Sequence, residues 1–222
     1  KNITVDAQGN LYVIDSVGWP GDITIQNLRL RKITPTGVVT TFPLDPALIP
    51  ALRAEDLAID SAGNFLTTPS DGNSIYRFAP GDTSYTRIVG GFYGDQDGPA
   101  LSAGLDRPAG FRIIDASNSL IISDNRNNLI RRVSAGTVST LAGQAITGTA
   151  NGTGSEARFL YPEAIVVAPS GDAFVADYGN HTIRKITSSG EVSTLAGQPG
   201  KSGNTNGPGN LAQFKNPSDL AL

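Results

Sequence analysis

A segment of about 54 residues that recurs along the chain constrains the fold more than any other feature of the sequence. Its opening reads KNITVDAQGNLYVID at residues 1–15, DLAIDSAGNFLTTP at 56–69, GFRIIDASNSLIISD at 110–124 and AIVVAPSGDAFVAD at 164–177. The residues that follow the first short apolar run of each copy, at spacings of 54, 55 and 53, are Asp6, Asp60, Asp115 and Ala168. Such a period fits one small sheet per repeat, packed against the sheets of neighbouring repeats.

The fourth copy shows the strand pattern of one unit most clearly. Short apolar or alternating runs are separated by turns rich in Asp, Asn, Ser and Gly, and they lie at Ala164–Val167, Ala173–Ala176, Thr182–Ile186 and Val192–Leu195. Four short strands joined by tight turns predict an antiparallel meander. The first strand is almost continuously apolar, which is typical of a strand that is buried on both faces.

Glycine-rich connectors join the units, and three of them share a pattern. Each has Asp or Asn before Gly, then a small Ala, a large apolar residue and finally Pro, as in Asn151-Gly152, Ala157, Phe159 and Pro162. The others carry Ala103, Leu105 and Pro108, and Ala212, Phe214 and Pro217. We expect the Ala and the large residue to pack between neighbouring sheets, and the Pro to set the start of the next strand.

Residues 174–197, FVADYGNHTIRKITSSGEVSTLAG, resemble the NHL repeat, and the resemblance extends over nearly the whole chain. It is weakest in the second unit, where Pro69 stands in place of Asp15, Asp124 and Asp177. The resemblance implies an all-β fold, a β-propeller with four-stranded antiparallel blades, in a single propeller region over residues 1–222. We expect blades at 1–41, 55–90, 109–142 and 163–196 and the first strand of a fifth at 217–222. Because known members resemble six-bladed propellers, the chain is expected to form an arc of a six-bladed ring.

One polar triplet recurs with the repeat. Asp177, Asn180 and Arg184 correspond to Asp124, Asn127 and Arg131, and to Asp15, Asn27 and Arg31. The triplets could form a ring of ligand-binding groups, or Asp and Asn could hold the turn between strands two and three while Arg braces the blade. We favour the structural interpretation, because a residue that recurs in each unit is usually needed for the fold of that unit.

Composition narrows the classes of function. The net charge of -3 and the pI near 5.1 lack the basic surplus that phosphate binding requires, so we expect no nucleic acid partner. With no Cys and one histidine, His181, the sequence does not match the histidine-held metal of the peptide-amidating lyases that NHL-like propellers include. We predict no cofactor. Asp and Asn are abundant enough to leave open a channel calcium, as in gluconolactonase-like propellers. No apolar run is long enough for a membrane span.

Two candidate binding segments lie on one predicted face. In an antiparallel meander the connectors and the turns between strands two and three emerge on the same side. There the first unit inserts SVGWPGDITIQ at residues 16–26, which holds Asp22 and the only tryptophan, Trp19. Trp19 could be an exposed binding tip or could fold back over the blade, and both remain open.

The second candidate segment is the connector at residues 90–97. It offers Tyr93 and the carboxylates of Asp95 and Asp97, which could receive a cation or sugar hydroxyls. A solvated loop in which Asp97 caps a turn is the simpler interpretation.

These observations favour a non-catalytic binding scaffold that presents its connector loops to a protein or a glycan, in an extracellular or periplasmic location. The alternative from a different class is a propeller-type lyase or lactonase with a metal in the central channel.

The Trp19 hypothesis can be tested directly. If the ring is a binding tip, Trp19→Ala should weaken partner binding and leave the melting temperature nearly unchanged. A large loss of thermal stability would instead assign Trp19 to the packing of the blade.

Overall fold

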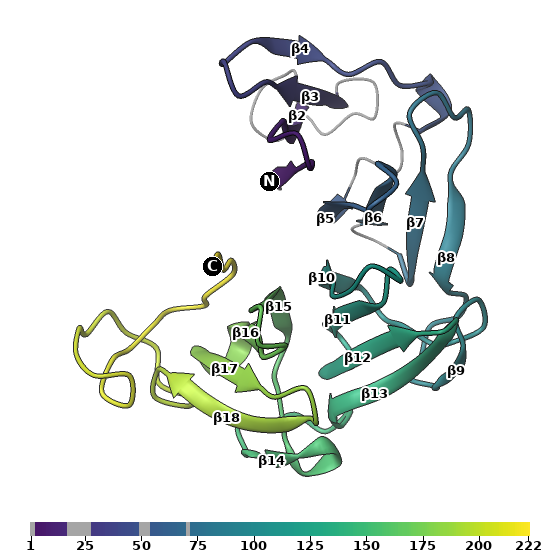
Figure 1. Ribbon diagram of the computed structural model, residues 1–222. Helices are drawn as coiled ribbons and strands as arrows, with labels where there is room; N and C mark the ends of the chain where they lie inside the picture. The colour runs from purple at the N-terminus through teal and green to yellow at the C-terminus, as the bar shows by residue number, and fades with distance from the viewer. Residues whose placement is uncertain (1–2, 17–27, 49–53, 70–71) are drawn as a thin grey trace.

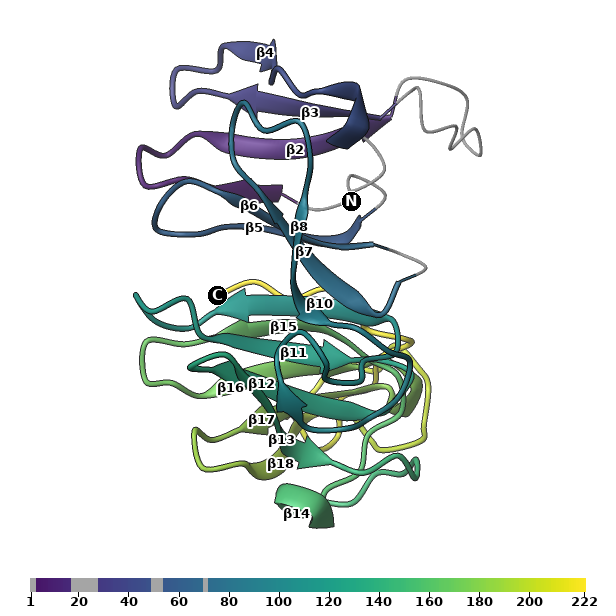
Figure 2. The ribbon, with the colours of Figure 1, turned by 90° about the vertical axis from the view of Figure 1, so that its right-hand side faces the viewer.

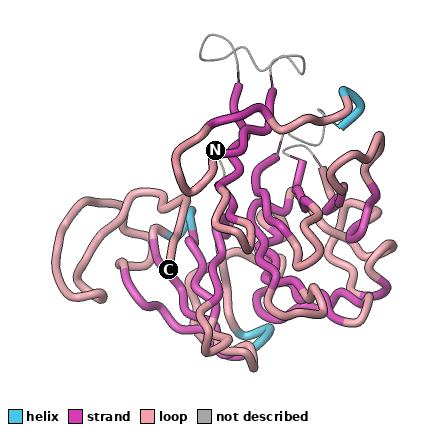
Figure 3. Tube along the Cα trace, turned by 45° about the horizontal axis from the view of Figure 1, so that its top comes forward, coloured by secondary structure: helices cyan, strands magenta, loops and turns pink. Residues whose placement is uncertain are grey.

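Four antiparallel sheets follow one another along the chain, each built from one copy of the repeat (Figure 1). The computed structural model describes residues 3–16, 28–48, 54–69 and 72–222. Trp19, Asp22 and Asn27 lie outside the described residues. The regular structure is almost entirely strand, with short helical turns in a few loops (Figure 3). In the described part of the chain, no helix is long and apolar enough to cross a membrane.

Each sheet is a meander of four strands. Blade one contains β1 (Ile3–Val5), β2 (Leu11–Ser16), β3 (Leu28–Ile33) and β4 (Val39–Thr41). Blade two contains β5 (Ala54–Ile59), β6 (Phe65–Pro69), β7 (Ser74–Phe78) and β8 (Thr86–Gly90). Blade three contains β10 (Pro108–Ile113), β11 (Leu120–Asp124), β12 (Leu129–Ser134) and β13 (Thr137–Gly143). Blade four contains β15 (Pro162–Val167), β16 (Ala173–Asp177), β17 (Thr182–Ile186) and β18 (Glu191–Ala196).

Short pieces of two connectors extend the last two blades. β9 (Gly98–Pro99) pairs with β13, and β14 (Gly152–Thr153) pairs with β18, so each adds a fifth strand at the outer edge. The 3-10 turn η3 (Gly154–Glu156) follows β14, and η4 (Tyr178–Asn180) joins β16 to β17. The connectors are therefore tied to the blades by backbone hydrogen bonds.

The blades are arranged around a common axis as an open arc (Figures 1 and 2). The first strands β1, β5, β10 and β15 lie side by side nearest the axis, and β5 contacts both of its neighbours. This arrangement confirms the prediction of a β-propeller with four-stranded antiparallel blades. Residues 217–222, expected to begin a fifth blade, form no strand.

Equivalent backbone positions recur every 54 residues. The N–H groups of Asp6, Asp60, Ile114 and Ala168 each donate across the first turn of their blade, with N···O distances of 2.9–3.0 Å. The third turn is one residue longer, which moves the turn aspartate to Asp115, and this explains the uneven spacings in the sequence. The carboxylates of Asp6, Asp60 and Asp115 accept turn N–H groups, as expected of residues that begin the first turn.

The cores lie between blades, and each is shared by two sheets. Tyr12 and Leu30 of blade one pack against Leu57, Phe65 and Phe78 of blade two. The core between blades two and three contains Leu66, Ile75, Val89, Phe111, Ile122 and Val138. The core between blades three and four contains Ile121, Ile130, Ile165, Val175 and Val192. The connector residues Ala103 and Leu105, and Ala157 and Phe159, are fully buried in these cores, as the sequence pattern predicts.

The recurring polar triplet forms a buried clamp between the blade and its connector, which we call the arginine clamp. In blade four Arg184 Nη1 donates to Asp177 Oδ2 at 2.9 Å, and the guanidinium also reaches the carbonyls of Arg158 and Ala150. Asn180 Nδ2 donates to the same carboxylate at 2.7 Å. The structural interpretation of the triplet is therefore the correct one for this blade.

Blade three repeats the arginine clamp. Arg131 Nη1 lies 2.8 Å from Asp124 Oδ2, and Asn127 Nδ2 lies 2.9 Å from the same oxygen. Burial raises the pKa of Asp124 to about 6, although the hydrogen bond from Asn127 and the charge of Arg131 lower it. In blade one the Arg31–Asp15 distance is 3.8 Å and the pair is partly exposed, and in blade two Tyr76 replaces the arginine and packs against Tyr85.

The arginine clamp generates a stability prediction. Replacing Arg184 by Leu leaves the Asp177 carboxylate buried without its counter-ion, so we expect the free energy of unfolding to fall by about 3–5 kcal/mol. The neighbouring Lys185 pairs with Asp172 at 2.9 Å on the surface, where water screens the pair, so Lys185→Leu should cost much less than Arg184→Leu. Urea unfolding of both variants measures the two losses in the free energy of unfolding. Equal losses would show that the clamp does not hold the blade.

Candidate functional site

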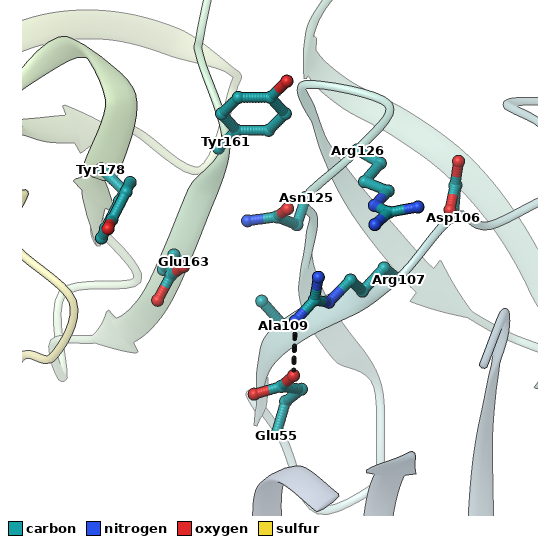
Figure 4. Close-up of a pocket in the computed structure, with 9 residues that line it drawn as sticks. All are labelled: Glu55, Asp106, Arg107, Ala109, Asn125, Arg126, Tyr161, Glu163 and Tyr178. Carbon is teal, nitrogen blue, oxygen red and sulfur yellow. Dashed lines mark hydrogen bonds and ion pairs between the residues drawn. The ribbon is translucent and has the colours of Figure 1, made fainter. Parts of the chain in front are cut away.

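A polar cavity of about 590 Å³ opens on the connector face, near the axis, where blades two, three and four meet (Figure 4). Its lining comes from all three blades: Glu55, Asp106, Arg107, Ala109, Asn125, Arg126, Tyr161, Glu163 and Tyr178. Three repeat positions supply most of these residues. They are the second residue of the inner strand, the residue just before that strand, and the turn between strands two and three.

In blades two, three and four the pairing register of the inner strand shifts at its second residue. In β5 the pairing passes from Ala54 to Asp56, and in β10 from Pro108 to Gly110, so β-bulges lie at Glu55 and Ala109. Glu163 holds the same place in β15. Two bulges thus carry carboxylates, while the one between them carries only a methyl group. The cavity has room because Ala109 leaves the space between Glu55 and Glu163 unfilled.

The residue before the connector proline has a left-handed backbone in three connectors. Arg107, Tyr161 and Asn216 have φ of 51°, 52° and 52°, and each precedes the connector proline. The N–H of Arg107 donates to the Gly72 carbonyl, that of Tyr161 to Asn128 Oδ1, and that of Asn216 to His181 Nδ1, at 3.0–3.2 Å.

A left-handed conformation costs a side-chain-bearing residue roughly 1–2 kcal/mol, so the previous blade's turn holds it in place. The repeat therefore fixes this backbone and leaves the side chain free to differ. Two of the three, Arg107 and Tyr161, line the cavity.

The turns between strands two and three form the remaining walls. Asn125 Nδ2 donates to the carbonyl of Pro162 at 3.1 Å and links blade three to the inner strand of blade four. The Arg126 N–H donates to the Asp106 carbonyl at 3.1 Å, which fixes this turn against its connector. Tyr178 and Glu163 lie together on the blade-four side, facing Asn125 and Arg107 across the cavity (Figure 4).

Side chains of opposite charge lie close together in the cavity. Arg107 Nη2 lies 3.1 Å from Glu55 Oε1 at the base (Figure 4). Burial raises the pKa of Glu163, the negative charge of Glu55 raises it further, and the positive charge of Arg107 lowers it. The cavity therefore offers hydrogen-bond acceptors from its carboxylates and donors from its guanidinium and amide groups. Among the described residues, no three His, Cys, Asp or Glu side chains are grouped closely enough to hold a metal.

The described residues of the sequence-based candidate site lie away from this cavity. Tyr93 and Asp95 are exposed on the connector between blades two and three, and neither lines the cavity. Asp97 joins the arginine clamp of blade three, where it accepts from Arg131 Nη2 at 2.8 Å and from the Thr140 hydroxyl at 3.0 Å. Trp19 and Asp22 fall outside the described residues.

The cavity residues were missed because no sequence pattern marks them as a group. Glu55, Arg107 and Tyr161 lie about one repeat apart and share no residue type. One feature of the sequence could have indicated them. The connector proline recurs, but the residue before it differs between connectors and is Arg107, Tyr161 or Asn216.

The radial blades, their shared cores and the cavity at the mouth of the axis define the class of protein as a β-propeller. The family model of the NHL repeat matches residues 159–186, which span β15 to β17. The chain is thus a β-propeller chain with a match to the NHL repeat in its fourth blade. A comparison with curated protein sequences gave no match.

Several solved structures have a similar fold. A structural genomics protein of unknown function from Bacteroides thetaiotaomicron has a TM-score of 0.69 at 19% identity, over 98% of this chain and 52% of its own. An auxiliary nutrient binding protein from Bacteroides ovatus has a TM-score of 0.66 at 18% identity, over 99% and 53%. Virginiamycin B lyase from Staphylococcus aureus has a TM-score of 0.52 at 18% identity, over 87% and 54%. This chain spans about half the length of these proteins, and at such identities the likeness shows the fold alone.

The electrostatics of the cavity can be tested by titration. Because Arg107 lowers the pKa of Glu163 and Glu55 raises it, Arg107→Ala should raise that pKa further and Glu55→Gln should lower it. Carbon-13 NMR of the side-chain carboxyls measures both shifts. Asp172, which pairs with Lys185 at a first turn, serves as the control and should titrate unchanged. Shifts of the same sign in the two variants would contradict the proposed arrangement.

Proposed function

We propose that this chain is a non-catalytic binding scaffold that receives a glycan in the cavity on its connector face. The observation that carries the proposal is the cavity itself, which three blades build from left-handed and bulged backbone positions. Rigid blades hold those positions, so the groups that meet a ligand are ordered before it arrives.

The chemistry of the lining supports a hydroxyl-rich ligand. A sugar hydroxyl both donates and accepts hydrogen bonds, and the cavity supplies carboxylate acceptors beside the amide of Asn125 and the guanidinium of Arg126. The side chain of Tyr161 is exposed at the rim and offers an apolar ring face with a polar tip. This combination matches the alternating apolar and polar surfaces of a pyranose ring.

The balance of charge supports an uncharged ligand. Three carboxylates, those of Glu55, Asp106 and Glu163, face two guanidinium groups, those of Arg107 and Arg126. A strongly anionic or cationic ligand would meet groups of its own sign on one wall.

Two solved propellers of similar fold are named as auxiliary nutrient binding proteins, and this supports a binding role for the present chain. A binding scaffold for a nutrient glycan would act outside the cytoplasm, which is the location we propose.

The second candidate is an enzyme of the lyase or lactonase class with a channel metal. The observation that favours it is the fold shared with virginiamycin B lyase from Staphylococcus aureus and with a putative gluconolactonase. Metal analysis of the purified protein separates the two proposals. One tightly held calcium or zinc ion per chain would support the enzyme, and a metal-free protein that binds glycan would support the scaffold.

Glycan binding gives the decisive prediction. On an array of immobilised oligosaccharides the protein should retain particular glycans, and Tyr161→Ala or Glu163→Gln should weaken their binding at least about tenfold by calorimetry, because each removes a contact at the cavity. Tyr93→Ala removes an exposed tyrosine outside the cavity and should leave the affinity within about twofold. Unchanged affinity in both cavity variants, or loss in Tyr93→Ala alone, would refute the cavity as the binding site.

A further inference from the structure

A second cavity, of about 520 Å³, lies between blades three and four on the face opposite to the connectors. Its rim comes from the first turns of both blades and from the turn between β17 and β18. Successive turns of an antiparallel meander alternate between its two sides, so these turns emerge away from the connector face. Among the described residues, the two cavities share no lining side chain.

The floor of this second cavity is aliphatic. Ile121 is almost fully buried, and Ile114, Leu141 and Val167 are partly buried where the core between blades three and four reaches the surface. The aliphatic side chains that line the cavity are Ile113, Ile114, Ile121, Leu141 and Val167. An apolar ligand would be stabilised here, because it would remove these side chains from water.

One cation, Arg132, lies beside the aliphatic floor. Arg132 is paired with Ile121 across β11 and β12, so both side chains are on the face of blade three that looks toward blade four. The preceding residue, Arg131, is held by the carboxylates of Asp124 and Asp97. Over the part of the chain that the structure describes, no acceptor forms a hydrogen bond or an ion pair with Arg132. Its N–H donors are therefore available to an anion.

The carboxylate of Asp115, at the rim, is held by its own turn. Asp115 Oδ1 accepts the N–H groups of Ser117 and Ser119 at 2.9 and 3.0 Å. Hydrogen bonds from Ser119 and Ser117 lower the pKa of Asp115, and the positive charge of Arg132 lowers it further. Arg132 is thus near enough to act on Asp115 through space, although the two form no ion pair. A ligand with a second carboxylate would be repelled by Asp115.

The repeat changes at the turn that faces Arg132. Blades one to three begin their first turn with Asp6, Asp60 and Asp115, whereas blade four has Ala168, which lines the cavity. The turn does not need the carboxylate. The Ala168 N–H donates to the Asp172 carbonyl at 2.9 Å, as the Asp60 N–H donates to the Asn64 carbonyl. The substitution therefore keeps the turn and removes the carboxylate that would share the cavity with Arg132.

We propose that this second cavity binds a medium-chain aliphatic monocarboxylate, whose chain covers the aliphatic floor and whose carboxylate accepts hydrogen bonds from Arg132. The planar guanidinium matches the two oxygens of a carboxylate. A volume of about 520 Å³ is within the range of small-molecule sites. The site lies on the opposite face from the cavity proposed for a glycan, and it does not depend on glycan binding.

Three ligands with the same chain length test which charge the cavity recognises. Octanoate carries one carboxylate, suberate carries two, and octylamine carries an ammonium group instead. By calorimetry the protein should bind octanoate, and suberate should bind at least about tenfold more weakly because its second carboxylate meets Asp115. Octylamine should show no measurable binding, since Arg132 repels it. Octylamine binding as tight as that of octanoate, or no octanoate binding, would overturn the proposal.

A matched pair of arginines tests the anchor. Arg132→Gln should weaken octanoate binding at least about tenfold, because the amide keeps a donor but loses the charge. Arg77 has the same register in blade two, where it pairs with Leu66, but it is exposed and does not line the cavity. Arg77→Gln should leave the affinity within about twofold. Equal effects of the two substitutions would show that Arg132 does not hold the carboxylate.

Restoring the residue of the other repeats gives a second test. Ala168→Asp returns the turn to the form found in blades one and two, so the variant should fold, which its melting temperature checks. Its carboxylate should compete for Arg132 and weaken octanoate binding at least about tenfold. Ala168→Asn has nearly the same shape without the charge and should bind octanoate within about threefold of the unaltered protein. Equal affinities of the two variants would refute a site that depends on an unpaired Arg132.

Discussion

A small sheet that is apolar on both faces can be buried only between two neighbours, and the whole structure depends on this constraint. Each blade contributes side chains to two cores, as blade three does with Phe111 toward blade two and Ile130 toward blade four. Because no blade completes a core alone, the sheets stack in sequence, and their twist turns the stack around an axis. The inner strands then converge, and their ends bring residues of three repeats to one cavity.

The buried ion pairs make that cavity a rigid one. A glycine-rich connector has little apolar surface with which to hold itself in place, so Arg131 and Arg184 satisfy connector carbonyls from within the blade. Each guanidinium is balanced by a carboxylate, Asp124 or Asp177, whose raised pKa reports how little water reaches it. The connectors that lead to Arg107 and Tyr161 are thereby fixed before the chain turns into the next blade.

The sequence predicted what the repeat itself determines. The period, the four-strand pattern and the connector pattern of Ala157 and Phe159 all reflect burial that every blade shares, and each was confirmed. The cavity could not be predicted, because it depends on differences between repeats: a carboxylate at Glu55 and Glu163, a methyl group at Ala109. Asp97 is the opposite case. Its loop looked like a binding segment in the sequence, but its carboxylate accepts from Arg131 and belongs to the arginine clamp of blade three. Local pattern reveals what repeats, and only the assembled arc shows which unlike residues meet.

The left-handed residue before the connector proline keeps one backbone geometry while its side chain differs between repeats. Its N–H is held by the preceding turn whether the residue is Arg107, Tyr161 or Asn216, so the main chain keeps one path while three unrelated side chains are displayed. Duplicated units of this kind can acquire new ligand preferences through single codon changes, one per unit, with the architecture unaltered. For protein engineering, these positions can be randomised together in a small library, from which pockets of chosen chemistry can be selected.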